Sequence, residues 1–136
     1  MNNSNRTVES RIDVIESSYE YMLAYAAQGR ESDEGVGGGP SVRETLSNLA
    51  MAMTGLSEAV IDAESAAVTR DFAESLATDA LHARRAVELV LSRPRISSQL
   101  IDNLNATIHL RAVLTDLFLI DEALKCQNSS SQDQQS

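Results

Sequence analysis

The chain has 136 residues, a formal net charge of −9, two histidines, one cysteine and no tryptophan. This length suits one domain with a sizeable core, and 43% hydrophobic with 23% charged residues is typical of a globular protein. A single cysteine excludes an intramolecular disulfide framework and a cysteine-based zinc site within this chain. Eleven basic against twenty acidic residues argue against binding to a nucleic-acid backbone.

No apolar run approaches the roughly 18–20 residues of a membrane span. The polar N-terminus also lacks the apolar segment of a secretory signal, so we expect a cytoplasmic protein that does not associate with membranes. Residues 1–5 and 127–136 are polar, which predicts disordered ends on either side of a single domain over residues 6–126.

A first helix is predicted from about Thr7 to Gln28, because apolar residues recur at alternating steps of four and three. This stripe consists of Val8, Ile12, Ile15, Tyr19, Met22 and Ala26. Gly29 suits the left-handed conformation that ends many helices. Five of the six glycines lie between residues 29 and 39, and Pro40 follows them. We therefore expect a long glycine-rich loop, serving as a flexible connector, before the next helix.

The second helix is expected to begin at Ser41, since Ser41 and Glu44 match a capping box. Its apolar stripe continues to Val60, and residues 56–93 contain no glycine or proline. One unbroken helix of about 50 residues would be about 75 Å long. We therefore place a turn near residues 62–65, with Ser65 as N-cap, and a third helix from about 66 to 92, which Pro94 ends.

The fourth helix is predicted from Ser97 or Ser98 to Lys125. It contains four consecutive apolar residues, Leu117 to Ile120, which cover every direction around a helix. Such a run lies either at the centre of a bundle or in a subunit contact. No strand pattern competes, and the short connections between the last three helices favour antiparallel neighbours. We predict an all-α, antiparallel four-helix bundle, and the excess apolar surface of its first and last helices predicts a homodimer.

His82 flanks the stripe of the third helix, with Asp79 three residues before it and Arg85 three residues after it. A metal site is one interpretation, because ferritin-like bundles carry Glu-x-x-His on two helices. Asp79 and His82 offer one shortened copy, whereas Ala106 stands at the matching position before His109. The pair of motifs is therefore incomplete, and we expect neither a metal nor another cofactor.

Phosphotransfer is a second interpretation of His82. An outward histidine next to Arg85 on a four-helix bundle looks, in outline, like the histidine phosphotransfer domains of bacterial signalling. The likeness covers residues 81–85, and the lysine–glycine pair that usually follows the family's histidine is missing. A surface histidine with a carboxylate three residues away is the simpler interpretation. For His109 we expect a structural or surface role, and Cys126, at the C-terminal end of a helix, lacks the polarity that activates a thiol.

The first helix carries the most distinctive surface. Four carboxylates follow the core stripe and form an acidic ridge, namely Glu9, Asp13, Glu16 and Glu20. The ridge is either a solvated face or a docking edge for a basic partner segment. Tyr21 and Tyr25 lie one turn apart and away from the main stripe, so they either broaden the core or form an interface.

No constellation of nucleophile, base and orienting group is visible in the sequence. We therefore predict a non-enzymatic interaction protein: an adaptor, a chaperone-like factor or a small regulator. It is expected to bind a protein partner through the first helix, the fourth helix or both.

Overall fold

A computed structural model describes residues 2–34, 41–64 and 66–135, with side chains placed for residues 8–34, 41–64 and 66–125. These residues form helices and no strand, so the protein is all-α, as predicted. None of the described helices is long and apolar enough to cross a membrane. The helices are α1 (Asn2–Ala26), α2 (Val42–Met53), α3 (Leu56–Ala63), α4 (Ala67–Leu91), α5 (Ser98–Asn105) and α6 (Ile108–Gln135).

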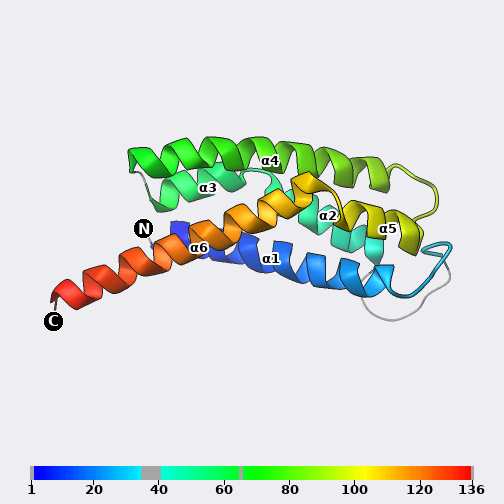
Figure 1. Cartoon of the computed structure of the whole chain (residues 1–136), viewed down its shortest axis with the longest axis horizontal. Helices are drawn as coiled ribbons and strands as arrows, with labels where there is room; N and C mark the ends of the chain where they lie inside the picture. The colour runs from blue at the N-terminus through cyan, green and yellow to red at the C-terminus, as the bar shows by residue number, and fades with distance from the viewer. Residues whose placement is uncertain (1, 35–40, 65, 136) are drawn as a thin grey trace.

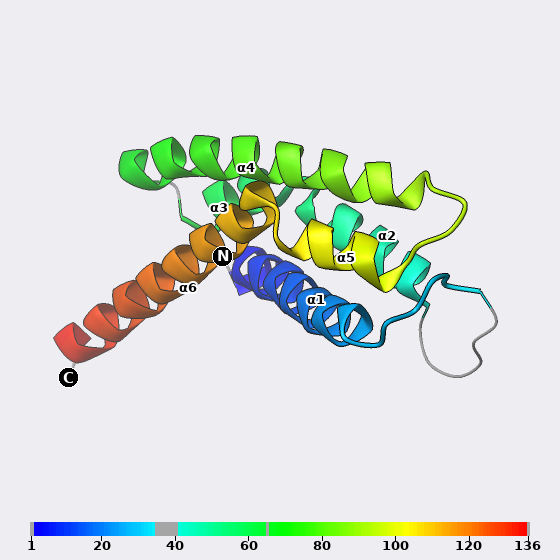
Figure 2. The same ribbon diagram turned by 45° about the vertical axis from the view of Figure 1, so that its right-hand side comes forward.

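The helices lie side by side in two directions. In Figure 1, α1 and α4 run one way, whereas α2 with α3, and α5 with α6, return the other way. α1 packs against α2, α3 and α5, while α6 packs mainly against α4. Figure 2 shows the same arrangement after a turn, with α6 crossing the other helices at an angle.

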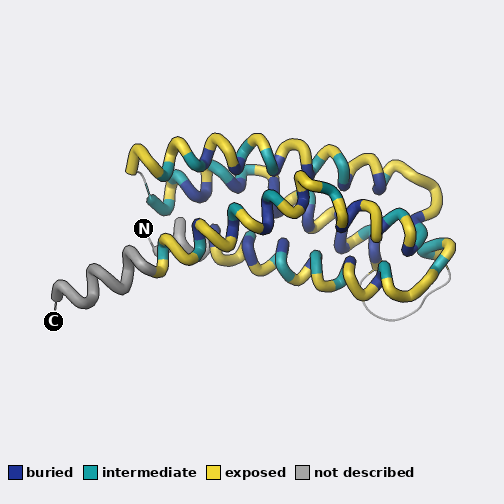
Figure 3. Tube along the Cα trace, in the orientation of Figure 1, coloured by how far each residue is buried: buried dark blue, intermediate teal, exposed yellow. Residues whose placement is uncertain are grey.

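One hydrophobic core runs between the helices, and their outer faces are exposed (Figure 3). The stripe predicted for the first helix faces this core, since Val8, Ile12, Ile15 and Met22 are all buried. Most of the stripe of α4 is buried as well, from Leu76 through Val90. The 4–3 spacing of apolar residues thus gave the inward side of both long helices correctly.

The prediction of four helices is wrong in number, because two of the predicted helices are broken. The first break separates α2 from α3 at Thr54 and Gly55, where Gly55 has a φ of +77°. Glycine reaches this left-handed conformation without the steric cost that other residues meet. Nη1 of Arg11 on α1 donates to the carbonyl oxygen of Thr54 at 2.6 Å, and this hydrogen bond satisfies a carbonyl at the break.

The second break separates α5 from α6 at Ala106 and Thr107, inside the predicted fourth helix. Two polar side chains engage backbone carbonyls here. Thr107 Oγ1 donates to the carbonyl of Leu104 at 2.8 Å, and Asn105 Nδ2 donates to the carbonyl of Met22 at 3.2 Å. Short polar side chains offer the backbone such local alternatives to a continuing helix.

The other predicted boundaries can be compared with the structure in part. A turn between Ala63 and Ala67 agrees with the predicted turn near residues 62–65, while Ser65 itself lies outside the described residues. Gly29 has the expected positive φ, +66°. Residues 35–40 of the glycine-rich loop are not described. α1 begins at Asn2 and α6 extends to Gln135, within the segments predicted to be disordered, and that disorder stays a prediction.

Candidate functional site

A groove with a volume of about 560 Å³ lies between α1 and α2. Its apolar lining comes from Val14 and Tyr21 on α1 and from Met51 and Ala52 on α2. Met51 is 70% exposed, although the other apolar residues of α2 face the core. A long, flexible thioether side chain at the edge of an open groove is well suited to contact with a partner.

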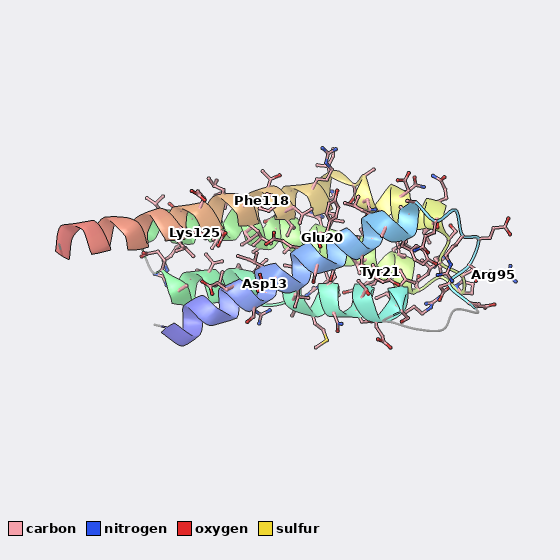
Figure 4. All side chains as sticks on the ribbon, turned by 90° about the horizontal axis from the view of Figure 1, so that it is seen from below. Asp13, Glu20, Tyr21, Arg95, Phe118 and Lys125 are labelled. Carbon is pink, nitrogen blue, oxygen red and sulfur yellow. The ribbon has the colours of Figure 1, made fainter. Side chains whose placement is uncertain are left out.

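The acidic ridge lies beside this groove. Ser10 and Ser17 on α1 line the groove, and Asp13 is three residues from one and four from the other. Residues at these spacings are neighbours on a helix surface, and Glu20 stands three residues beyond Ser17. Figure 4 shows Asp13, Glu20 and Tyr21 along α1, with α2 on one side and α6 on the other. Glu9, Asp13 and Glu20 are exposed, and Glu16 is half-buried.

The two tyrosines of α1, for which the sequence leaves both a core role and an interface role open, differ in their surroundings. Tyr25 is only 1% exposed and belongs to the core, whereas Tyr21 is half-buried and lines the groove. The two rings stack with their centroids 6.3 Å apart. The core interpretation therefore describes Tyr25, because at this depth its ring is not available to a partner.

Tyr25 anchors a polar network, which we call the polar corner. It comprises Tyr25, Arg30, Asp33, Arg43, Ile96 and Ser98. The Tyr25 hydroxyl donates to the carbonyl of Ile96 at 2.6 Å, and the Ser98 hydroxyl donates to the carbonyl of Tyr25 at 2.7 Å. The backbone N–H of Arg30 donates to the Ser98 hydroxyl at 2.8 Å. These bonds join the end of α1 to the start of α5, where buried polar groups need partners.

Asp33 connects the same corner to α2. Its Oδ2 pairs with Nε of Arg43 at 2.8 Å, and its Oδ1 accepts from the N–H of Ile96 at 3.0 Å. Burial alone would raise the pKa of the Asp33 carboxyl, but the hydrogen bonds from Arg43 and Ile96 outweigh it and lower that pKa. Arg43 also donates to three backbone carbonyls at and just after the end of α4, those of Leu91, Arg93 and Pro94.

A second polar cluster lies between α4 and α6, and we call it the α4–α6 seam. It consists of Asp79 and His82 on α4 and of His109 and Asp116 on α6. The imidazole rings of His82 and His109 stack, with centroids 4.7 Å apart and planes inclined by 24°. Both histidines are exposed, so this contact lies at the surface of the interface. The topology thus brings together the chain's two histidines, which the sequence analysis treats separately.

The carboxyl groups of Asp79 and Asp116 meet across the same seam. The pKa of Asp116 is raised from 3.8 to about 7. Burial is the largest cause, and the hydrogen bond with Asp79 and the charge of Asp79 add to it. Oδ2 of Asp116 is buried and has no hydrogen-bond donor among the described residues. Two ionised carboxylates are both acceptors, so only a proton on one of them can supply that donor. The sequence analysis missed Asp116. It stands seven residues after His109 on the same helix, and that spacing is the one signal that points to it.

The remaining candidate residues are placed as follows. Arg85 is exposed on α4, and a phosphotransfer role for His82 stays a prediction. Among the residues with placed side chains, no group of three or more histidine, cysteine or carboxylate residues is arranged to hold a metal ion. The side chain of Cys126 lies outside this part of the chain. In the apolar run of α6, Leu117 and Ile120 are buried, whereas Phe118 and Leu119 are 57% and 59% exposed.

Comparison of the chain with protein-family models, with curated proteins and with solved structures gives no match.

Proposed function

We propose that the protein is a non-enzymatic interaction protein that binds a basic amphipathic helical segment of a partner protein along the α1–α2 groove. One observation carries this proposal: an open, mainly apolar groove runs beside the exposed carboxylates of Asp13 and Glu20. A partner helix would place its apolar side against Met51 and Tyr21 and its basic edge against the ridge. Helix-in-groove recognition uses this combination of apolar anchors and complementary charge.

A synthetic helical peptide of about 18 residues tests the proposal, with leucines at i, i+3, i+4 and i+7 and lysines beside them. Its matched control carries glutamates in place of the lysines. Fluorescence anisotropy is expected to show binding of the basic peptide and none of the acidic one. Affinity for the basic peptide should fall as salt rises, since exposed charges are screened. Equal binding of both peptides, or binding of neither, contradicts the proposal.

A pair of variants locates the binding surface. Met51→Ser removes an apolar side chain of the groove, and the affinity is expected to fall about tenfold, equivalent to about 1.4 kcal/mol. Leu89→Ser is the matched control, because Leu89 is 62% exposed on α4 and does not line the groove. If Leu89→Ser weakens binding as much as Met51→Ser, the peptide binds elsewhere.

Self-association is a separate part of the proposal. Phe118 and Leu119 expose adjacent apolar side chains on α6, and two copies of the chain would cover them by pairing. Light scattering at micromolar concentration is expected to give two chains per particle, and Phe118→Ser with Leu119→Ser to give one. A wild-type particle of one chain contradicts the dimer and leaves the peptide experiment unaffected.

A further inference from the structure

α6 is attached to the rest of the protein in an uneven way. It follows the break at Ala106 and Thr107, and its main packing partner is α4, with a smaller contact to α1 and another to α5. Figures 1 and 2 both show α6 beginning near the middle of α4 and then diverging from it. A helix that follows a break and packs mainly on one neighbour is released more easily when that contact weakens.

That contact contains a pair of like-charged groups. The carboxyls of Asp79 and Asp116 meet in the α4–α6 seam, and Oδ2 of Asp116 is buried there without a donor. One proton shared by the pair turns one carboxyl into a donor for the other and satisfies that oxygen. Loss of the proton leaves two negative charges in contact and a buried oxygen without a hydrogen bond, and both effects oppose packing.

We propose that Asp79 and Asp116 form a proton-dependent clasp, which holds α6 on α4 while the two carboxyls share a proton and releases the first half of α6 when the proton leaves. The pKa of Asp116, about 7, places this change near neutral pH. The clasp is independent of the α1–α2 groove, so it concerns how the fold responds to pH and not which partner it binds.

Other titratable groups lie around the clasp. His82 on α4 and His109 on α6 belong to the same seam, where their rings stack with centroids 4.7 Å apart. From α1, the charge of Glu16 acts on Lys125, and Lys125 pairs with Asp121 of α6 at 3.1 Å. The charge that acts on Asp116 is that of Asp79.

Hydrogen exchange of the α6 amides tests the clasp in the full-length protein. Exchange is measured by mass spectrometry at pH 6 and pH 8, and each rate is divided by the intrinsic rate at that pH. Protection of residues 110–117 is expected to fall about tenfold over this range, because the carboxyl of Asp116 returns from a pKa of about 7 to its ordinary value of 3.8 on release. Amides of α1 and α2 serve as the internal reference and should keep their protection.

Two variants separate the clasp from other carboxylates. Asp116→Asn gives Asp79 a permanent amide donor, so protection of residues 110–117 should change less than about twofold between the two pH values. Asp121→Asn removes a carboxylate from the same helix outside the clasp and should behave like the wild type. Asp79→Asn provides the same test from α4 if the first variant fails to fold.

Three outcomes overturn the proposal. One is wild-type protection of α6 that does not change between pH 6 and pH 8. Another is a fall that persists in both Asp116→Asn and Asp79→Asn. The third is an equal loss of protection in α1, α2 and α6, which would mean that the pair acts on the whole fold and not on α6.

Discussion

The polar corner and the α4–α6 seam each contain a partly buried aspartate, and the two carboxyls respond to burial in opposite ways. Asp33 in the corner meets the guanidinium of Arg43 and the N–H of Ile96, and its pKa is lowered. Asp116 in the seam meets another carboxyl, and its pKa is raised to about 7. Burial disfavours the charge in both places, so the partner decides which protonation state the fold prefers.

The difference gives the two regions opposite dependences on pH. A carboxyl with a lowered folded-state pKa stabilises the fold above its unfolded pKa, and this contribution is lost as the pH falls through the folded value. A carboxyl with a raised pKa stabilises the fold fully below its unfolded pKa of 3.8, and this contribution is lost as the pH rises through about 7. The corner is therefore weakened by acid and the seam by neutral and basic pH.

Tyr25→Ala should have the largest effect and would show how strongly the corner supports the fold. The ring is buried, and its hydroxyl donates to Ile96, so we expect the free energy of unfolding to fall by about 3–5 kcal/mol. Urea unfolding followed by circular dichroism measures this change. Tyr21→Ala is the matched control and should cost less than about 1.5 kcal/mol, since Tyr21 is half-buried at the groove. Equal losses in the two variants would contradict the different placement of the two tyrosines.

Asp33→Asn should break the favourable partnership that defines the corner. It removes the charge that pairs with Arg43 and weakens the acceptor of the Ile96 N–H, so we expect a loss of about 2 kcal/mol at pH 7. The loss should shrink as the pH falls below the ordinary carboxyl value of 3.8, because the stabilisation that accompanies the lowered pKa of Asp33 is lost there. Ser47→Ala, an exposed change on the same helix as Arg43, should shift stability by less than about 0.5 kcal/mol. A loss that is the same at pH 3 and pH 7 would mean that the charge of Asp33 is not what matters.

Asp116→Asn should change the free energy of unfolding in the opposite direction. The variant gives Asp79 a hydrogen-bond donor, as Arg43 does for Asp33. At pH 8, above the pKa of Asp116 of about 7, its carboxyl is mostly ionised next to the charge of Asp79, so the amide should raise the free energy of unfolding by about 1 kcal/mol. At pH 4.5 the pair holds its proton, and the gain should be near zero. Thermal unfolding at both pH values measures the difference, with Asp121→Asn as the control. Destabilisation by Asp116→Asn at pH 8 would contradict the repulsion between the two carboxyls.

The sequence predicts the buried faces of the helices better than the breaks between them, for physical reasons. Periodic apolar residues identify the buried sides of α1 and α4. The helix repeat of 3.6 residues places them on one face, whichever helices pack against that face. The same periodicity does not predict the breaks at Gly55 and at Ala106. They depend on donors and acceptors from other helices, such as Arg11 on the carbonyl of Thr54 and Asn105 on the carbonyl of Met22.

The candidate sites are even more dependent on the packing of distant segments. All residues of the acidic ridge lie on one helix, so their spacing alone predicts that they share a face. Three of the four carboxylates are exposed there. The burial of Tyr25 depends on Ile96 and Ser98, which are more than 70 residues away along the chain. The pairing of Asp79 with Asp116 and of His82 with His109 depends on which helices are neighbours and in what register. Spacing along one helix carries no such information.

His82→Gln should have the smallest effect and would separate the two halves of the seam. Both stacked rings are exposed, so the variant should change the free energy of unfolding by less than about 0.5 kcal/mol at pH 8. It should also leave intact the loss of stability between pH 5 and pH 8, because that loss belongs to the carboxyl pair. Chemical denaturation across this pH range measures both quantities. The opposite result is a pH dependence that disappears in His82→Gln and persists in Asp116→Asn. The histidines and not the carboxyls would then set the response of the seam to pH. The contrast with the polar corner would lie between a carboxylate and an imidazole pair.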